Sequence, residues 1–105
     1  MDFQEAQRLV DDWIQNVGGG YFSPLTNMSL LAEETGEVAR IIARRYGDQR
    51  AKSGEEISDD ALADELADVI RVAICLANQT GIDLDQAMRR NLAKISTRDR
   101  NRFTD

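Results

Sequence analysis

The chain has no histidine, one cysteine and one proline among its 105 residues, and each shortage narrows what it can be. Without histidine, the Ser-His and Cys-His nucleophile systems are excluded. Zinc is disfavoured as well, because it relies on His and Cys ligands. The single cysteine, Cys75, cannot form an internal disulfide, and its apolar surroundings predict a buried thiol. Any chemistry must therefore use carboxylates, amines, hydroxyls and water.

Long hydrophobic segments and a surplus of positive charge are also missing. No apolar run approaches the roughly 20 residues that a membrane span requires, and the N-terminal residues lack the basic and apolar regions of a signal peptide. With 19 acidic and 13 basic residues the net charge is −6, which disfavours nucleic acid as a partner. We therefore expect a cytoplasmic protein that binds neither membranes nor nucleic acid.

Apolar residues recur at helical spacing along most of the chain, and no segment has the alternation of a strand flanked by turns. The pattern predicts four helices. The first two cover residues 2–17 and 24–46, the third begins after Ser58 and ends before Gly81, and the fourth begins after Asp83. The fold class is therefore all-α, a four-helix bundle in which the second and third helices are antiparallel.

Polar or glycine-rich segments separate these helices. Gly18–Gly20 is not followed by the Gly-Lys-Ser/Thr of a phosphate loop, so a flexible cap and turn is expected there. Ser23 and Pro24 suit the cap and first position of the second helix, and residues 47–57 are expected to form a mobile surface loop. The sequence predicts one domain over residues 1–105, and its small size favours oligomers.

Two segments share the pattern acid-acid-x-x-acid followed by valine, Glu33-Glu34-Thr35-Gly36-Glu37 and Asp64-Glu65-Leu66-Ala67-Asp68. On a helix each triple forms a patch on one side, and both patches interrupt stripes that are otherwise apolar. Burying unpaired carboxylates is costly, so we expect a cation to compensate. Residues three apart are neighbours on a helix, and the candidate metal ligands are therefore Glu34, Glu37, Glu65 and Asp68.

All-oxygen ligation is typical of Mg²⁺, with Mn²⁺ as a possible substitute. A di-iron bundle would need Glu-x-x-His motifs, which the chain lacks. Because Mg²⁺ in proteins often also binds substrate phosphates, the pattern favours attack of water on phosphorus. Glu33 or Asp64 could accept the proton of this water, or either could have an outer-shell or surface role. A structural helical module with solvated acids is the alternative.

A phosphate substrate also needs cationic partners. Lys94 and Arg98 lie four residues apart on one face of the fourth predicted helix, and Arg102 would continue the row if that helix persists. Basic residues near a helix C-terminus also suit the helix dipole. Composition alone leaves both interpretations open.

The two acidic segments resemble the motif of the MazG-like nucleotide pyrophosphohydrolases, which belong to the all-α NTP pyrophosphatase superfamily. The mark of that superfamily is EExxE followed, after a spacer, by ExxD. Other segments that are similar, and in the same order, are Gly20–Leu25, Arg45–Gly47, Cys75–Asn78 and Thr97–Asp99. The resemblance covers nearly the whole chain and is to the short single-domain bacterial branch of the family.

This resemblance implies Mg²⁺-dependent hydrolysis of a nucleoside triphosphate to the monophosphate and pyrophosphate. It implies that the metal ligands are Glu34, Glu37, Glu65 and Asp68, and it favours Lys94 and Arg98 as phosphate-binding residues. It also implies a homodimer, or a tetramer made of two dimers, with the active site near a subunit interface. House-cleaning of damaged nucleotides and trimming of ordinary dNTPs both fit. A metal- and nucleotide-binding module without turnover is the other alternative.

Three aromatic residues precede the acidic helix and are candidates for stacking on a nucleobase, namely Trp13, Tyr21 and Phe22. Phe22 is the strongest candidate because it lies near the mouth of the predicted site. Each of the three could instead belong to the core, which is the interpretation we favour for Trp13.

Overall fold

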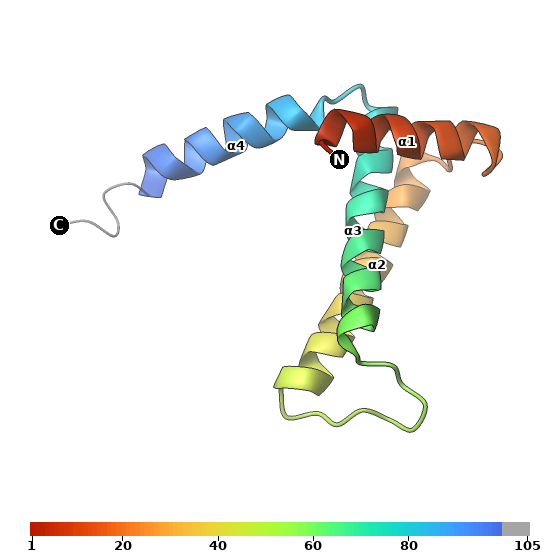
Figure 1. Ribbon diagram of the computed structural model, residues 1–105, viewed down its shortest axis with the longest axis vertical. Helices are drawn as coiled ribbons and strands as arrows, with labels where there is room; N and C mark the ends of the chain where they lie inside the picture. The colour runs from red at the N-terminus through yellow and green to blue at the C-terminus, as the bar shows by residue number, and fades with distance from the viewer. Residues whose placement is uncertain (100–105) are drawn as a thin grey trace.

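The second and third helices of the chain form an antiparallel pair. The first helix lies across one end of this pair, and the fourth points away from it (Figure 1). The computed structural model describes residues 1–99 and contains no strand within them. The helices are α1 (Phe3–Asn16), α2 (Pro24–Tyr46), α3 (Asp59–Gln79) and α4 (Leu84–Asp99). The all-α prediction is confirmed, and the predicted helix limits agree closely with the observed ones.

The helices begin at the predicted caps. In each case a side-chain oxygen accepts a hydrogen bond from the backbone N–H three residues later, which satisfies a donor that the first helical turn leaves unpaired. The capping residues of α2, α3 and α4 are Ser23, Ser58 and Asp83. After α1 the chain turns through Gly19 and Gly20, whose φ values of +81° and +106° favour glycine. The triplet is therefore a turn, as predicted.

The core lies mainly on α3, which is the central helix as its wide apolar set leads one to expect. Its buried residues include Val72, Ile74, Cys75 and Ala77, and Ile41 of α2 is packed against this helix with 1% of its surface exposed. The buried thiol of Cys75 confirms the prediction for the single cysteine. The α2–α3 pair is thus the rigid element on which the acidic residues are carried.

A polar network fastens α1 and the following turn to the C-terminal end of α3. The Asn78 side chain accepts a hydrogen bond from Gln7 Nε2 (2.9 Å) and donates to the Gln7 carbonyl (3.1 Å) and to the Tyr21 hydroxyl (3.0 Å). Tyr21 in turn donates to Asp11 Oδ1 at 2.6 Å. Burial and this hydrogen bond raise the pKa of Tyr21 to about 12, so the phenol remains a donor at neutral pH. One asparagine therefore links three segments.

The loop between α2 and α3 is irregular, as predicted, but its middle is attached to α2. The Glu55 carboxylate accepts hydrogen bonds from Arg40 Nη1 at 2.8 Å and from Arg44 Nε at 3.0 Å. A further ion pair, Arg45 Nη2 to Asp59 Oδ1 at 2.6 Å, joins the end of α2 to the start of α3. The loop is therefore attached to α2 through Glu55, and the ends of the two helices that it connects are joined directly to each other.

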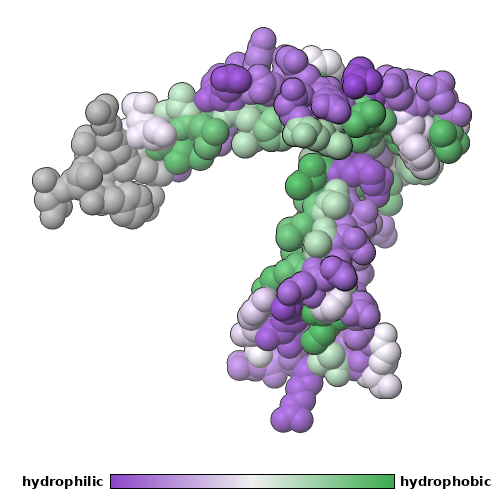
Figure 2. All heavy atoms as spheres, in the orientation of Figure 1, coloured by the Kyte–Doolittle hydropathy of each residue, from purple (hydrophilic) through white to green (hydrophobic). Residues whose placement is uncertain are grey.

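The single chain is open rather than closed. Its Cα radius of gyration is 17.0 Å, whereas a compact chain of this length would have a value of about 13 Å. The hydrophobic residues gather along α3 and along the side of α4 that faces it (Figure 2). Ile70 of α3 and Leu92 of α4 are 56% and 58% exposed. None of the described helices combines the length and hydrophobicity needed to cross a bilayer.

Trp13 belongs to this exposed apolar surface. The interpretation of Trp13 as a core residue is wrong for the single chain, because 55% of its surface is exposed. The physical reason is that α1 lies across the end of the α2–α3 pair, where it contacts α3 and α4 but keeps part of its surface uncovered (Figure 1).

Candidate functional site

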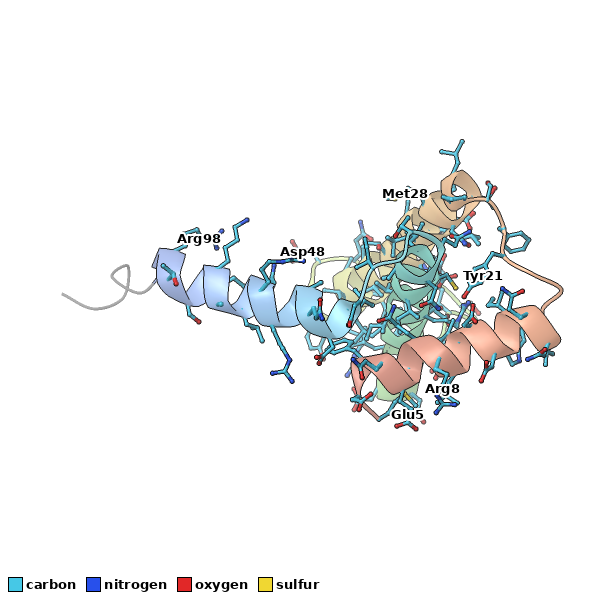
Figure 3. The ribbon with its side chains drawn as sticks, turned by 90° about the horizontal axis from the view of Figure 1, so that it is seen from above. Glu5, Arg8, Tyr21, Met28, Asp48 and Arg98 are labelled. Atoms are coloured by element: carbon cyan, nitrogen blue, oxygen red, sulfur yellow. The ribbon has the colours of Figure 1, made fainter. Side chains whose placement is uncertain are left out.

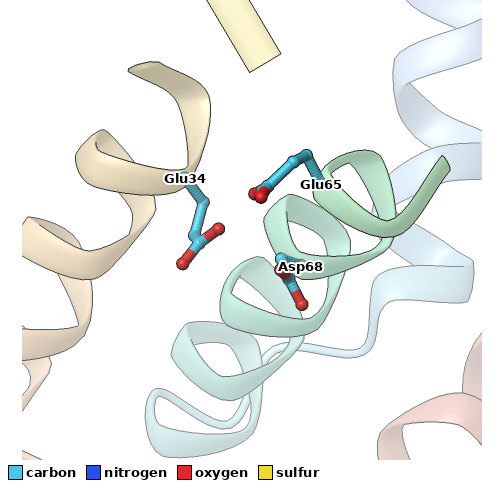
Figure 4. Close-up of side chains that lie close together, drawn as sticks. All are labelled: Glu34, Glu65 and Asp68. Atoms are coloured by element: carbon cyan, nitrogen blue, oxygen red, sulfur yellow. The ribbon is translucent and has the colours of Figure 1, made fainter. Parts of the chain in front are cut away.

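Three of the predicted metal ligands meet between α2 and α3. Glu34 projects from α2 toward Glu65 and Asp68 of α3, and one carboxylate oxygen from each of the three lies within 4.8 Å of the others (Figure 4). In an octahedral shell of oxygens at about 2.1 Å from Mg²⁺, neighbouring oxygens are about 3 Å apart and opposite ones about 4 Å. Small side-chain adjustments would thus bring the three carboxylates around one ion.

The helical register explains why these acids face inward. Glu34 lies on the same stripe of α2 as the buried Ile41, and Glu65 lies on the same stripe of α3 as the buried Val72. The stripes pack against each other along the α2–α3 pair. Each carboxylate is therefore carried to the edge of the apolar contact and is partly removed from water, as the sequence pattern predicts.

The electrostatics of the three acids require a proton or a cation. A hydrogen bond with the Glu65 carboxyl, partial burial and the charge of Asp68 together raise the pKa of Glu34 to about 7. Glu65 Oε2 is buried, and none of the hydrogen bonds among the described residues reaches it. A divalent cation would neutralise the repulsion and satisfy this oxygen, so the residues fit a Mg²⁺ or Mn²⁺ ion.

The fourth predicted ligand, Glu37, is not part of this group of three. Its Oε2 atom accepts two hydrogen bonds from Arg40, from Nη2 at 2.6 Å and from Nε at 3.2 Å. Glu37 nevertheless lines the same pocket as Glu65, an open polar space of about 820 Å³ between α2, the loop and α3. The side chain is therefore beside the acids but engaged with an arginine.

The two candidate proton acceptors differ in position. Asp64 lines the polar pocket together with Glu65, although its side chain is exposed. Glu33 is also exposed and is not among the residues that line this pocket. Of the two, Asp64 is the one that shares a cavity with the acids.

The aromatic residues line a second cavity, which shares no residue with the polar pocket. A cavity of about 260 Å³ is lined by Trp13, Tyr21 and Phe22, together with Arg71 of α3. Arg71 also donates to Asp68 Oδ1 at 3.4 Å, so this cavity adjoins the acidic group. Phe22 is 64% exposed and can receive a partner, whereas the Tyr21 hydroxyl is occupied by the network around Asn78 (Figure 3).

The predicted phosphate-binding residues are not near the acids of their own chain. Lys94 and Arg98 are exposed on α4, which points away from the α2–α3 pair. Figure 3 shows Arg98 toward the far end of this helix. Arg102, the third member of the predicted row, lies outside the described residues. If these residues serve the site, they must serve the site of another copy.

Two arginines at the site were missed by the sequence reasoning. Arg40 follows Glu37 by three residues and Arg71 follows Asp68 by three, and each is paired with that acid. The spacing of an acid followed three residues later by arginine is a signal for such pairs on a helix. The role of Glu55 had no comparable signal, because it comes from an irregular loop.

The sequence is similar to a family of known proteins and to individual members of it. Residues 22–103 match the MazG nucleotide pyrophosphohydrolase domain. The chain is 42% identical to YpjD of Bacillus subtilis (strain 168) over 101 residues, which cover 96% of this chain and 89% of YpjD. It is 28% identical over 103 residues to YvdC of the same organism, covering 93% of this chain and 96% of YvdC.

Two solved structures have the same fold. The crystal structure of the Bacillus-conserved MazG protein, a nucleotide pyrophosphohydrolase, matches with a TM-score of 0.75 and 36% identity, covering 90% of this chain and 88% of that one. The crystal structure of YpjD from Bacillus subtilis matches with a TM-score of 0.78 and 39% identity, covering 90% and 94%. The protein therefore belongs to the MazG nucleotide pyrophosphohydrolase family.

Proposed function

We propose that this protein is a Mg²⁺-dependent nucleoside triphosphate pyrophosphohydrolase, which converts a (d)NTP and water into the (d)NMP and pyrophosphate. The observation that carries the proposal is the meeting of Glu34, Glu65 and Asp68, with a buried oxygen of Glu65 that no hydrogen bond from residues 1–99 reaches. A structural relative with the same fold is a nucleotide pyrophosphohydrolase. The role proposed for this activity is house-cleaning of the nucleotide pool.

The residues that would hold Mg²⁺, or Mn²⁺ in its place, are Glu34, Glu65 and Asp68, with Glu37 as the fourth acid. When bound, the ion supplies positive charge to the phosphate oxygens and makes water at the site more acidic. The four carboxylates would hold the ion, and Arg71, by donating to Asp68, would keep one of them in place.

The protein's own groups would then handle the water and the substrate. Asp64, which shares the polar pocket with Glu65, accepts the proton of the attacking water, with Glu33 as the second candidate. The oxygen of this water forms a bond to the α- or the β-phosphorus, the bridge between these two phosphates breaks, and the monophosphate and pyrophosphate separate. Phe22, at the rim of the cavity beside Arg71, stacks on the nucleobase.

A homodimer, or a tetramer of two dimers, is part of the same proposal. The open shape leaves apolar residues uncovered on α3 and α4, among them Ile70 and Leu92. A second copy that covers them would bring its own α4 with it. Lys94 and Arg98 of that copy would then supply the positive charge that the phosphates need.

The test is a pyrophosphate-release assay with a panel of NTPs and dNTPs in the presence of Mg²⁺. Glu34→Gln and Asp68→Asn are each expected to lower turnover at least about 100-fold, because each removes a ligand charge from the ion. Glu5→Gln is the matched control, since Glu5 is an exposed acid on α1 away from the site. Unchanged turnover in both variants would refute the site, and Mn²⁺ binding without turnover on any substrate would instead favour a binding module.

A further inference from the structure

The Arg40 guanidinium bridges two acids that come from different parts of the chain. On one side, Nε and Nη2 donate to Glu37 Oε2 at 3.2 and 2.6 Å. On the other side, Nη1 donates to Glu55 Oε2 at 2.8 Å. Both bonds to Glu37 end on the same oxygen. Within the described residues, no hydrogen bond engages Glu37 Oε1, which stays available on a side chain that lines the pocket of Glu65.

The Glu55 side chain is itself fixed by several hydrogen bonds. Its Oε1 atom accepts from the Lys52 backbone N–H at 2.6 Å and from Arg44 Nε at 3.0 Å, and its side chain is 15% exposed. The Lys52 N–H and the arginines lower the pKa of Glu55 to about 2, so it is ionised at neutral pH. A planar guanidinium between two such partners has little freedom to rotate.

We infer that Arg40 is a positioning residue for the metal site, which it serves by holding Glu37 through one oxygen while Glu55 of the loop fixes Arg40 from behind. The inference rests on the proposed function, because it assigns Glu37 to the ion. A carboxylate that binds a metal with one oxygen is commonly oriented by a hydrogen bond to the other, and loss of such outer contacts typically weakens metal binding about 10- to 100-fold. Glu55, which lies outside both acidic motifs, thereby influences metal affinity.

A second interpretation makes the opposite prediction. If Arg40 merely competed with the ion for Glu37, its positive charge would oppose metal binding, and removal of that charge would strengthen binding. The two interpretations therefore predict opposite changes in metal affinity when Arg40 is replaced by a neutral residue. Arg40→Lys separates them further, because it keeps the charge but loses the two-pronged contact with Glu37.

The experiment measures Mn²⁺ binding to the metal-free protein, by the electron paramagnetic resonance signal of free Mn²⁺ and by calorimetry. Positioning predicts about 10-fold weaker binding in both Arg40→Lys and Arg40→Gln, and a loss of several-fold in Glu55→Gln. Arg45→Lys is the matched control and should bind like the original protein. Arg45 is also on α2 and also pairs with an acid across the loop, but that acid is Asp59.

The background variant Glu37→Gln shows whether the effect passes through Glu37. In this background, Arg40→Lys and Glu55→Gln are expected to cause no further loss of Mn²⁺ affinity. Tighter binding in Arg40→Gln, or an equal loss with and without Glu37, would overturn the inference. If the original protein bound no Mn²⁺, or bound it independently of Glu34, the proposed function itself would fail and this role would fail with it.

Discussion

Glu34 of α2 and Glu65 of α3 place their carboxyl groups close enough to share a hydrogen bond. Two ionised carboxylates at this separation repel each other, and partial burial increases the repulsion. The folded chain therefore holds this pair at a cost in stability. Such a cost is expected where a ligand supplies the missing positive charge.

Divalent cations should stabilise the fold through this pair. A ligand that binds the folded state alone stabilises it by mass action, by about 1.4 kcal/mol at a tenfold excess over its dissociation constant. For a domain of this size the melting temperature would rise by several degrees. We expect this rise with millimolar MgCl₂ in a thermal melt, with NaCl of equal ionic strength as the control. A melting temperature that did not respond, or that responded equally in Asp68→Asn, would contradict the site.

The stability of the metal-free protein should depend on pH through Glu34. Its pKa in the folded state is raised from the ordinary value of a glutamate to about 7, mainly by the hydrogen bond with Glu65. The folded state therefore holds this proton more tightly than the unfolded state, and the stabilisation is complete below the unfolded pKa. It is lost as the pH rises through about 7. The chain has no histidine, so no imidazole titrates in the same window.

Urea unfolding in EDTA between pH 4.5 and 8 measures this dependence. The free energy of unfolding is expected to fall over the range, and Glu34→Gln should flatten the curve because the amide does not titrate. Added Mg²⁺ should also reduce the fall, since the ion replaces the proton. An identical slope in Glu34→Gln would show that another group carries the pH dependence.

Local chemistry explains why most of the fold could be predicted from the sequence. The caps at Ser23, Ser58 and Asp83 and the positive φ angles at Gly19 and Gly20 depend on residues within one turn of each other. Neighbouring side chains decide such features, so a single sequence contains the necessary information.

Predicting that the acids meet required one further inference, from the helical periodicity of each segment to the contact between the two helices. Glu34, Glu65 and Asp68 interrupt apolar stripes, and two antiparallel helices joined by a loop must bring those stripes together. The pairing of Glu37 with Arg40 was within reach of the same reasoning, because it follows helical spacing. The contact with Glu55 was not, since the path of an irregular loop depends on tertiary contacts.

The exposure of Trp13 is another feature that the sequence pattern did not predict. Its position in the apolar stripe of α1 is correct, but periodicity does not say whether the surface that faces this stripe belongs to the same chain. For the same reason, periodicity does not determine the direction of α4. The proposed association of copies of the chain would account for both features.

The network around Asn78 should contribute measurably to stability. Its amide bonds to Gln7 and Tyr21 link α1 and the turn to α3. Asn78→Ala leaves these partly buried partners without the bonds, at an expected cost of about 2 kcal/mol in the free energy of unfolding. Urea unfolding measures this, with Asn91→Ala as the control because Asn91 is exposed on α4. Equal midpoints for the two variants would show that α1 is held mainly by its apolar contacts.

Phe22 should affect substrate binding and leave metal binding unchanged. Stacking of a base on an aromatic ring contributes about 1–3 kcal/mol, so Phe22→Ala is expected to raise KM about 10-fold. Phe22→Tyr keeps the ring and should keep the KM. The Mn²⁺ affinity should be the same in all three proteins. A normal KM in Phe22→Ala would mean that the base binds away from the cavity beside Arg71.

The proposal that Lys94 and Arg98 act on the acids of another copy can be tested by mixing inactive chains. Chains with Glu34→Gln would be combined with Lys94→Ala/Arg98→Ala chains and allowed to exchange subunits. If the acids of one site come from one copy and its Lys94 and Arg98 come from the other, a mixed dimer has one site with both defects and one intact site. Random exchange should then restore about a quarter of the original activity.

The matched control is a mixture of Glu34→Gln with Asp68→Asn chains. These two acids meet within one chain, so mixing cannot assemble an intact set and activity should stay absent. Subunit exchange would be verified by mass spectrometry of differently tagged chains. Exchange without any recovery in the first mixture would place the phosphate-binding groups elsewhere, with Arg71 as the next candidate because it already borders Asp68. Recovery in both mixtures would instead mean that the acids of one site are drawn from two chains.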